Sequence, residues 1–85
     1  METFTQPKIT GYRQLSEDEA ALMNEGKRLA EECGAFVAKL RELRREDNNG
    51  IYVAMHDPRW ISIGATDLQT GFMALMRAIA KPTSF

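Results

Sequence analysis

Three side chains of this sequence are suited to holding a planar, anionic ligand. Tyr12 offers a ring face on which a nucleobase stacks for ~1–3 kcal/mol. Lys27 carries an ammonium on a long stem that can lie over apolar surface and meet a phosphate. Arg59 stands at the start of a predicted helix, where backbone N–H groups and the helix dipole favour an anion. Their chemistry is that of nucleotide binding.

Each of these residues also has a purely structural explanation. An aromatic side chain such as Tyr12 commonly pins a terminal arm onto the rest of the fold. Lys27 is placed to pair with Glu31 one helical turn later, and Arg59 can be an ordinary surface arginine. The residues alone leave both explanations open. The same holds for a polar stripe on the second predicted helix, which either reads base edges or faces water: Thr66, Gln69 and Thr70.

Motifs for catalysis are missing from the sequence. It contains no phosphate-binding loop, no paired-cysteine metal site and no Glu-x-x-His spacing. His56 stands next to a predicted helix start, where a solvent-exposed loop residue is the simpler explanation than a general base. Cys33 falls on an apolar stripe and reads as an inert, packed thiol. We therefore expect no enzyme activity, no metal and no cofactor.

An arm of residues 1–15 is expected to precede a long first helix. The arm contains Pro7 and Gly11 and lacks helical periodicity. Ser16 and Glu19 form the Ser-x-x-Glu capping box, so the helix is expected to begin at Glu17 and run to about residue 45. Its apolar seam alternates steps of four and three: Leu22, Gly26, Leu29, Cys33, Phe36, Leu40 and Leu43.

A second helix of similar length follows a short connection, expected at about residues 46–56. Asp57 is a suitable N-cap with Pro58 at the first helical position, and Lys81-Pro82 ends the helix, which is expected over about 58–80. A short connection between two such helices favours an antiparallel pair. The predicted fold is all-α: an extended N-terminal arm followed by one helical hairpin domain over residues 16–85. Residues 51–55 of the connection are either strand-like or irregular, and no strand is predicted there.

Composition limits the classes of partner and the cellular compartment that the sequence predicts. Eleven Lys and Arg stand against 12 Asp and Glu, a net charge of -1, so no nucleic-acid polymer is expected as a partner. Apolar residues are interleaved with charge, so we expect no membrane span. One cysteine and no signal peptide favour a reducing cytoplasm. Because 85 residues bury little of their own surface, we expect self-association.

Two stretches of the sequence resemble one family. These are Gly11 to Ser16 with Leu22 to Asn24 and Lys27, and Asp57-Pro58-Arg59-Trp60 with Thr66 to Pro82. Both are similar to phage anti-CBASS sponges, helical hairpins that sequester cyclic dinucleotides and trinucleotides. The match covers roughly residues 9 to 85, with a poor match from Glu46 to His56. A sister family with the same hairpin sequesters cyclic ADP-ribose-type signals of Thoeris immunity, and usually has a longer insert between its helices.

The resemblance implies a function and a set of binding residues. It implies a non-catalytic sponge in the cytoplasm of the infected bacterial host, assembled as a homo-oligomer that the resemblance makes a hexamer. Tyr12 matches the family's base-stacking tyrosine and Lys27 its phosphate-contacting lysine, while Asn24 belongs to the same matched pattern. Arg59 is assigned to a separate cyclic-trinucleotide pocket. Tyr12 and Lys27 lie too far apart for one chain, so we expect two chains to share a pocket.

Two alternatives to the cyclic dinucleotide sponge remain open on the sequence. The first is a sponge for cyclic ADP-ribose-type Thoeris signals, which shares the hairpin. The second is a helical adaptor whose apolar seam pairs with the helices of another protein and that binds no small molecule.

Overall fold

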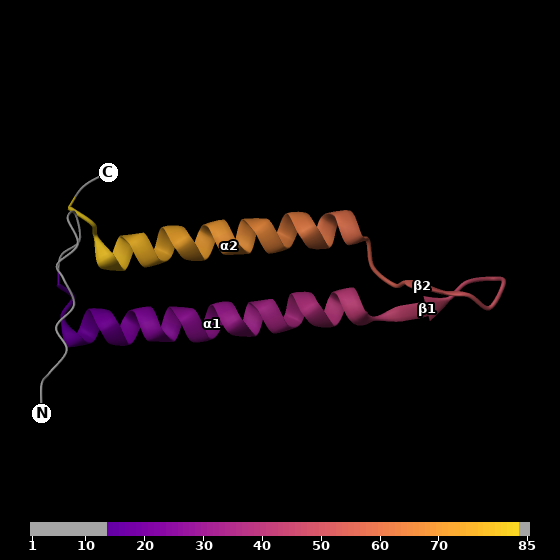
Figure 1. Ribbon diagram of the computed structural model, residues 1–85, viewed down its shortest axis with the longest axis horizontal. Coiled ribbons are helices and arrows are strands. Elements are labelled where there is room, and N and C mark those ends of the chain that lie inside the picture. The colour runs from indigo at the N-terminus through magenta and orange to yellow at the C-terminus, as the bar shows by residue number, and fades with distance from the viewer. Residues whose placement is uncertain (1–13, 84–85) are drawn as a thin grey trace, which may run out of the picture.

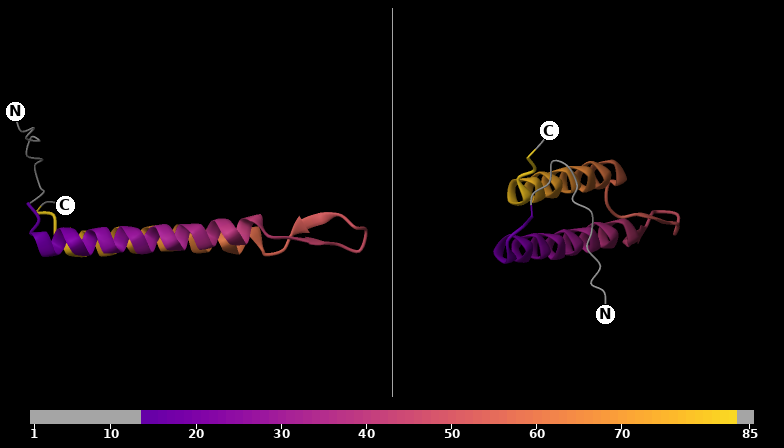
Figure 2. Two further views of the ribbon diagram at one scale, coloured as in Figure 1. Left: turned by 90° about the horizontal axis from the view of Figure 1, so that it is seen from below. Right: turned by 60° about the vertical axis from the view of Figure 1, so that its left-hand side comes forward.

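The computed structural model describes residues 14–83, which form an antiparallel helical hairpin. Helix α1 (Glu17–Glu42) is followed by strands β1 (Arg44–Glu46) and β2 (Tyr52–Ala54), and then by helix α2 (Pro58–Ala80). The two helices lie side by side, and the two-stranded ribbon projects beyond them at the end opposite the start of α1 (Figure 1). Both views in Figure 2 show the same extended arrangement. The predicted hairpin is confirmed.

Helix α1 begins at the residue that its sequence predicts. The Glu19 N–H donates to Ser16 Oγ at 3.2 Å, and the Ser16 N–H donates to Glu19 Oε1 at 3.0 Å. This capping box satisfies two backbone N–H groups that the first turn leaves without helical partners. Glu17, Asp18 and Glu19 place negative charge in the first turn, where the helix dipole favours it.

The first helix ends earlier than predicted, at Glu42 instead of about residue 45. Leu43 is already extended, with φ -66° and ψ 133°. The Arg44 guanidinium folds back and donates to the carbonyl oxygens of Arg41 at 2.6 Å and Leu43 at 3.2 Å. A side chain thus takes up carbonyl groups that the end of a helix leaves free, and the chain turns into a strand.

The connection contains a strand pair, so the prediction of an all-α chain is wrong here. Strands β1 and β2 pair antiparallel, with Arg45 opposite Val53. The Asp47 carboxylate accepts from the N–H groups of Asn49 at 2.8 Å and Ile51 at 2.9 Å, which builds the turn. Gly50 adopts a φ of 75°, a conformation that favours glycine. The ribbon is therefore held by its turn as well as by its ladder.

Helix α2 has a sequence-encoded start and stop. Asp57 is its N-cap, and Pro58 follows where its missing N–H leaves nothing unpaired. At the other end Lys81 takes a left-handed conformation with φ 45°, and its N–H donates to Arg77 O at 2.8 Å. Within residues 14–83, neither helix is long and apolar enough to span a bilayer.

The two helices meet along one stripe, and no residue of the described chain is buried. On α1 the half-buried positions alternate steps of three and four: Met23, Gly26, Ala30, Cys33, Val37 and Leu40. On α2 the corresponding half-buried side chains are Ile61, Ala65, Phe72, Met76 and Ile79. A Cβ at Gly26 would overlap Met76 Cε, so glycine at this position allows the helices to approach. One hairpin therefore has a contact stripe but no core.

Part of the predicted seam lies outside this stripe. Leu22, Leu29 and Phe36 are 51%, 40% and 60% exposed, although they share the predicted heptad rhythm. Their positions flank the contact stripe, so the apolar surface of α1 is wider than α2 alone can cover. The excess is the first indication that the hairpin has a second apolar contact to make.

Candidate ligand-binding groove

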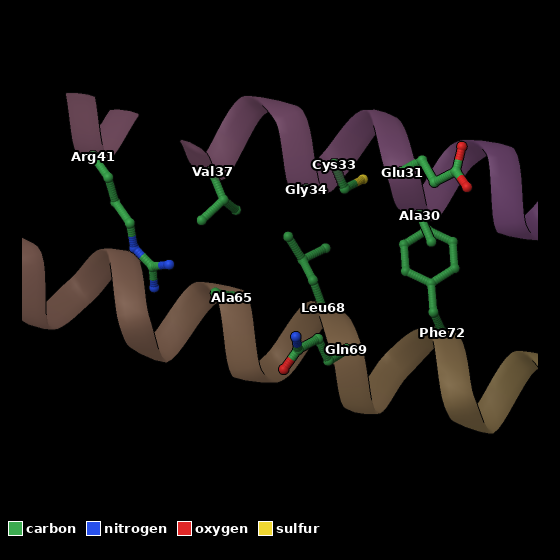
Figure 3. A pocket seen from close by; sticks show the side chains of 10 residues that line it. All are labelled: Ala30, Glu31, Cys33, Gly34, Val37, Arg41, Ala65, Leu68, Gln69 and Phe72. Atoms are coloured by element: carbon green, nitrogen blue, oxygen red, sulfur yellow. The ribbon is translucent and has the colours of Figure 1, made fainter. Parts of the chain in front are cut away.

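A groove of about 450 Å³ runs along one side of the hairpin, between α1 and α2. Figure 3 shows Val37 and Arg41 of α1 and Leu68 and Phe72 of α2 reaching into the space between the helices, with Glu31 and Gln69 at its sides. Its walls combine apolar side chains with three polar ones, Glu31, Arg41 and Gln69. We call this side of the hairpin the groove face and define it by Glu31, Gly34, Arg41 and Gln69.

Arg41 connects the two helices across the groove. It lies in the last turn of α1, and its Nη2 donates to Ser62 Oγ on α2 at 3.5 Å. Both side chains are exposed, so the link is easily exchanged for a ligand contact. A guanidinium is a planar, permanent cation whose donors match two oxygens of a phosphate. Arg41 is therefore the groove's natural anion contact.

The remaining lining suits a base or another planar group. Phe72 and Leu68 on α2 and Val37 on α1 form an apolar floor. Gln69 supplies an amide that both donates and accepts hydrogen bonds. Nothing lies within 4 Å of the position a Cβ would take at Gly34, so the α1 backbone stands open there. An apolar floor with a few convergent polar groups is the usual composition of a small-molecule site.

Lys27 and Asn24, predicted from the sequence as ligand contacts, lie on α1 beyond the groove lining. Both side chains are exposed. Asn24, Lys27, Glu31 and Gly34 follow at spacings of three and four, so they share one side of the helix. Lys27 and Arg41 thus stand on the same side of α1, separated by about 21 Å along its axis at 1.5 Å per residue. The groove lies between these two cations.

The predicted contacts on α2 divide between two places. Gln69 lines the groove, whereas Arg59 and Thr66 line a separate, open hollow of about 550 Å³ on α2 with Ser62, Ile63 and Asp67. Thr70 is exposed and lines neither of these two hollows. The structure therefore brings Gln69 together with the groove and leaves Arg59 and Thr66 apart from it.

The structure corrects the anion site predicted at the start of α2. The N–H groups of Arg59 and Trp60 donate to Asp57 Oδ1 at 2.9 Å and 3.4 Å. The capping carboxylate therefore occupies donors that the sequence argument had left for an anion. An anion near Arg59 would have to be bound by the guanidinium itself.

Tyr12 lies outside the described residues, so its approach to Lys27 of another chain stays a prediction. Conversely, sequence reasoning passed over Arg41. A cation in the last turn of a helix is already explained by the helix dipole, so no contact of Arg41 with α2 was predicted. The available signal was spacing, because positions 27, 34 and 41 are one heptad apart and fall on one side of a helix.

The other reactive residue types of the described chain have simple surroundings. Cys33 is half-buried in the groove wall, where it acts as a small apolar side chain. His56 lies before Asp57, against Trp60 and Leu40 in a hollow on the other side of the hairpin. Among residues 14–83 no three acidic, histidine or cysteine side chains gather as metal ligands would.

Comparison with known proteins identifies the fold's relatives. The family model of the Acb2/Tad1 hairpin domain matches residues 7–80. Anti-CBASS protein 2 of Pseudomonas phage JBD67 is 34% identical over 105 residues, an alignment that covers 88% of this chain and 92% of that protein. The match spans both helices, the ribbon and the groove between them. On both grounds, the chain belongs to the Acb2/Tad1 hairpin-domain family.

Proposed function

We propose that this protein is an anti-CBASS sponge, which binds cyclic oligonucleotide second messengers and withholds them from their receptors. The observation that carries the proposal is membership of the hairpin family together with 34% identity to a protein named for anti-CBASS action. The ligands are cyclic dinucleotides such as 3′,3′-cyclic GMP–AMP, with cyclic trinucleotides as a second class. The site of action is the cytoplasm of the infected bacterial host.

The groove face supports this ligand class chemically. A cyclic dinucleotide presents two phosphates and two planar bases. Lys27 and Arg41 supply cations on one side of α1, while Gln69 offers an amide for a base edge and Phe72 an apolar ring. A protein of net charge -1 needs such local cations to hold an anion.

The proposed action requires no catalytic step. A sponge lowers the free concentration of its ligand by mass action, so tight binding and high copy number replace turnover. The nucleotide is expected to leave the denatured protein chemically intact. Recovery of a linear or hydrolysed product would point to a nuclease instead.

The functional unit is proposed to be a homo-oligomer, a hexamer by the family resemblance. Tyr12 of one chain and Lys27 of another would then close one pocket over the ligand. The shortage of buried surface in one hairpin supports the need for assembly, because exposed apolar side chains gain most by packing against another copy.

Calorimetric titration tests the proposal. The purified protein is titrated with 3′,3′-cyclic GMP–AMP, cyclic tri-adenylate and a cyclic ADP-ribose isomer at one salt concentration. Binding of the first supports the CBASS sponge. Binding of the third alone would assign the protein to Thoeris signals, which the shared hairpin domain also allows. Heat from none of them would favour a helical adaptor.

The Lys27→Glu variant makes the test specific to the groove face. We expect it to lose affinity for cyclic dinucleotides, because it replaces an attraction to phosphate by a repulsion. Arg28→Glu is the matched control. It reverses a neighbouring charge on another side of the helix, where Arg28 forms an exposed ion pair with Glu32 at 2.9 Å. Equal affinities of both variants for every cyclic dinucleotide would overturn the assignment of Lys27.

A further inference from the structure

The groove carries a negative charge at the end away from Arg41. Glu31 of α1 lines the groove there, and Figure 3 shows its side chain and the Phe72 ring of α2 at the same end. Within residues 14–83 no hydrogen bond or ion pair engages the Glu31 carboxylate, and the pair with Lys27 that the sequence allows is not formed. Both carboxylate oxygens are therefore available to a ligand in the groove.

A carboxylate restricts what a groove for anions can hold. It repels the phosphates of a nucleotide, and it accepts hydrogen bonds without donating any. The repulsion is limited by the spacing of the two charged residues, because Arg41 lies about 15 Å further along the axis of α1, at 1.5 Å per residue. A ligand can therefore place a phosphate at the guanidinium and a base at Glu31.

Guanine is the base whose hydrogen-bonding edge fits a carboxylate. Its Watson–Crick edge presents two neighbouring donors, N1–H and the N2 amino group, and a carboxylate accepts both at once through its two oxygens. Adenine and cytosine present one donor beside a ring-nitrogen acceptor, and uracil presents one donor between two carbonyl oxygens. Each of these bases sets a lone pair against the negative oxygens, which opposes binding.

We propose that Glu31 makes the groove selective for guanine, so that the preferred cyclic dinucleotides contain at least one guanine. The inference rests on the proposed function and names the base that the same site reads. In this arrangement the guanine stacks on the Phe72 ring, its Watson–Crick edge meets Glu31, and a phosphate meets Arg41. The carboxylate both attracts guanine and disfavours the other bases.

Gln69 shares the groove but does not discriminate in this way. Its amide both donates and accepts, so it matches the donor–acceptor edge of adenine and turns over to suit other bases. Glu31 and Gln69 come from different helices, α1 and α2. A ligand with one guanine and one adenine, such as 3′,3′-cyclic GMP–AMP, offers each of them a matching edge. Selectivity among bases therefore depends on Glu31.

Calorimetric titration of the full-length protein with cyclic di-GMP, cyclic di-IMP and cyclic di-AMP at one salt concentration tests the inference. The base of IMP is guanine without its N2 amino group, so the first two ligands differ only in a donor assigned to Glu31. The wild type is expected to bind cyclic di-GMP roughly 10- to 100-fold more tightly than cyclic di-AMP. Its affinity for cyclic di-IMP is expected to lie between the two.

Glu31→Gln is the informative variant, because an amide of nearly the same shape replaces the carboxylate. It is expected to lose the preference for cyclic di-GMP over cyclic di-IMP and to bind cyclic di-AMP more tightly than the wild type does. Glu32→Gln is the matched control. It removes the same charge on another side of α1, where Glu32 pairs with Arg28 at 2.9 Å, and should leave all three affinities unchanged.

Other outcomes overturn the inference. Equal wild-type affinities for cyclic di-GMP and cyclic di-AMP, or a preference for cyclic di-AMP, would show that the groove does not select guanine. Unchanged selectivity in Glu31→Gln would show that another residue reads the base. In each of these cases the binding itself retains the sponge. Heat from none of the three ligands, nor from 3′,3′-cyclic GMP–AMP, would remove the proposed function together with this inference.

Discussion

The two sides of the hairpin are built by the same pair of helices and differ in what flanks the contact stripe. On the groove face the flanking side chains are polar, as at Arg41 and Gln69, and Gly34 has no side chain. This surface is therefore concave and partly polar. On the opposite side, which we call the apolar face, they are large and apolar, as at Leu29, Phe36 and Trp60, which are 40%, 60% and 63% exposed. A change of residue type on the flanks of one stripe thus separates a partly polar groove from an exposed apolar surface.

The strongest way to break this division is to place a charge on the apolar face. Leu29→Asp would place a carboxylate among the apolar side chains that the proposed homo-oligomer would cover, and burying it there costs several kcal/mol without a partner. We expect the mass measured by light scattering to fall to that of a smaller species. Ala35→Asp introduces the same charge on the outer side of α1 and should leave the mass unchanged. An unaltered mass for Leu29→Asp would show that this face stays free.

On the groove face, truncating Arg41 is expected to weaken ligand binding without changing the assembly. A hydrogen bond to a charged group contributes about 1.5–3 kcal/mol, so Arg41→Ala should lower the affinity for 3′,3′-cyclic GMP–AMP by roughly 10- to 100-fold. Calorimetry measures the affinity, and light scattering the mass. Arg45→Ala removes an exposed cation of β1 outside the groove and is the matched control. Equal losses in both variants would mean that the groove is not the site.

Two helical glycines sharpen the comparison of the contact stripe with the groove. Gly26→Ala displaces the flexible end of Met76, so the gain in helix propensity is offset and the free energy of unfolding is expected to stay within about 1 kcal/mol of the wild type. Gly34→Ala meets open space and is expected to raise it by up to about 1 kcal/mol through helix propensity. Urea unfolding at one fixed protein concentration measures both. A destabilised Gly34→Ala variant would indicate that the groove is filled within the folded protein.

The smallest expected effect comes from a site outside both faces. Ser16→Ala removes the side-chain half of the capping box and should lower stability by about 1 kcal/mol. Thermal unfolding followed by circular dichroism reports the loss. Ligand affinity and assembly should stay as in the wild type, so this variant separates a general loss of stability from damage to either face. A loss of affinity here would tie ligand binding to the start of α1.

Sequence signals were sufficient for the helical hairpin because they are local. The capping box at Ser16 and Glu19 and the Asp57-Pro58 start each fix a helix end through neighbouring atoms. The ribbon escaped prediction for the opposite reason. Arg44-Arg45-Glu46 has no strand pattern of its own and becomes a strand only by pairing with β2.

The candidate site was predictable only in part. Lys27 and Gln69 were singled out from the sequence; Gln69 lines the groove, whereas Lys27 lies on α1 beyond the groove lining. Arg41 was missed, because its charge has a sufficient local explanation until α2 is seen to lie across from it. Which part of the wide apolar seam would face α2 was equally undecided. Two neighbouring heptad rows of α1 are both apolar in the sequence, and only the contact with a partner helix determines which row is covered.

The lack of a buried side chain in residues 14–83 bears on the lifetime of the protein. A lone hairpin with no core opens readily, and an open chain is a substrate for proteases. Association protects it, and the protection increases as the protein concentration rises. We therefore expect newly made chains to be short-lived while scarce and long-lived once abundant. Accumulation of such a protein would be switch-like, with degradation setting the threshold, and pulse-chase labelling at low and high expression would show it.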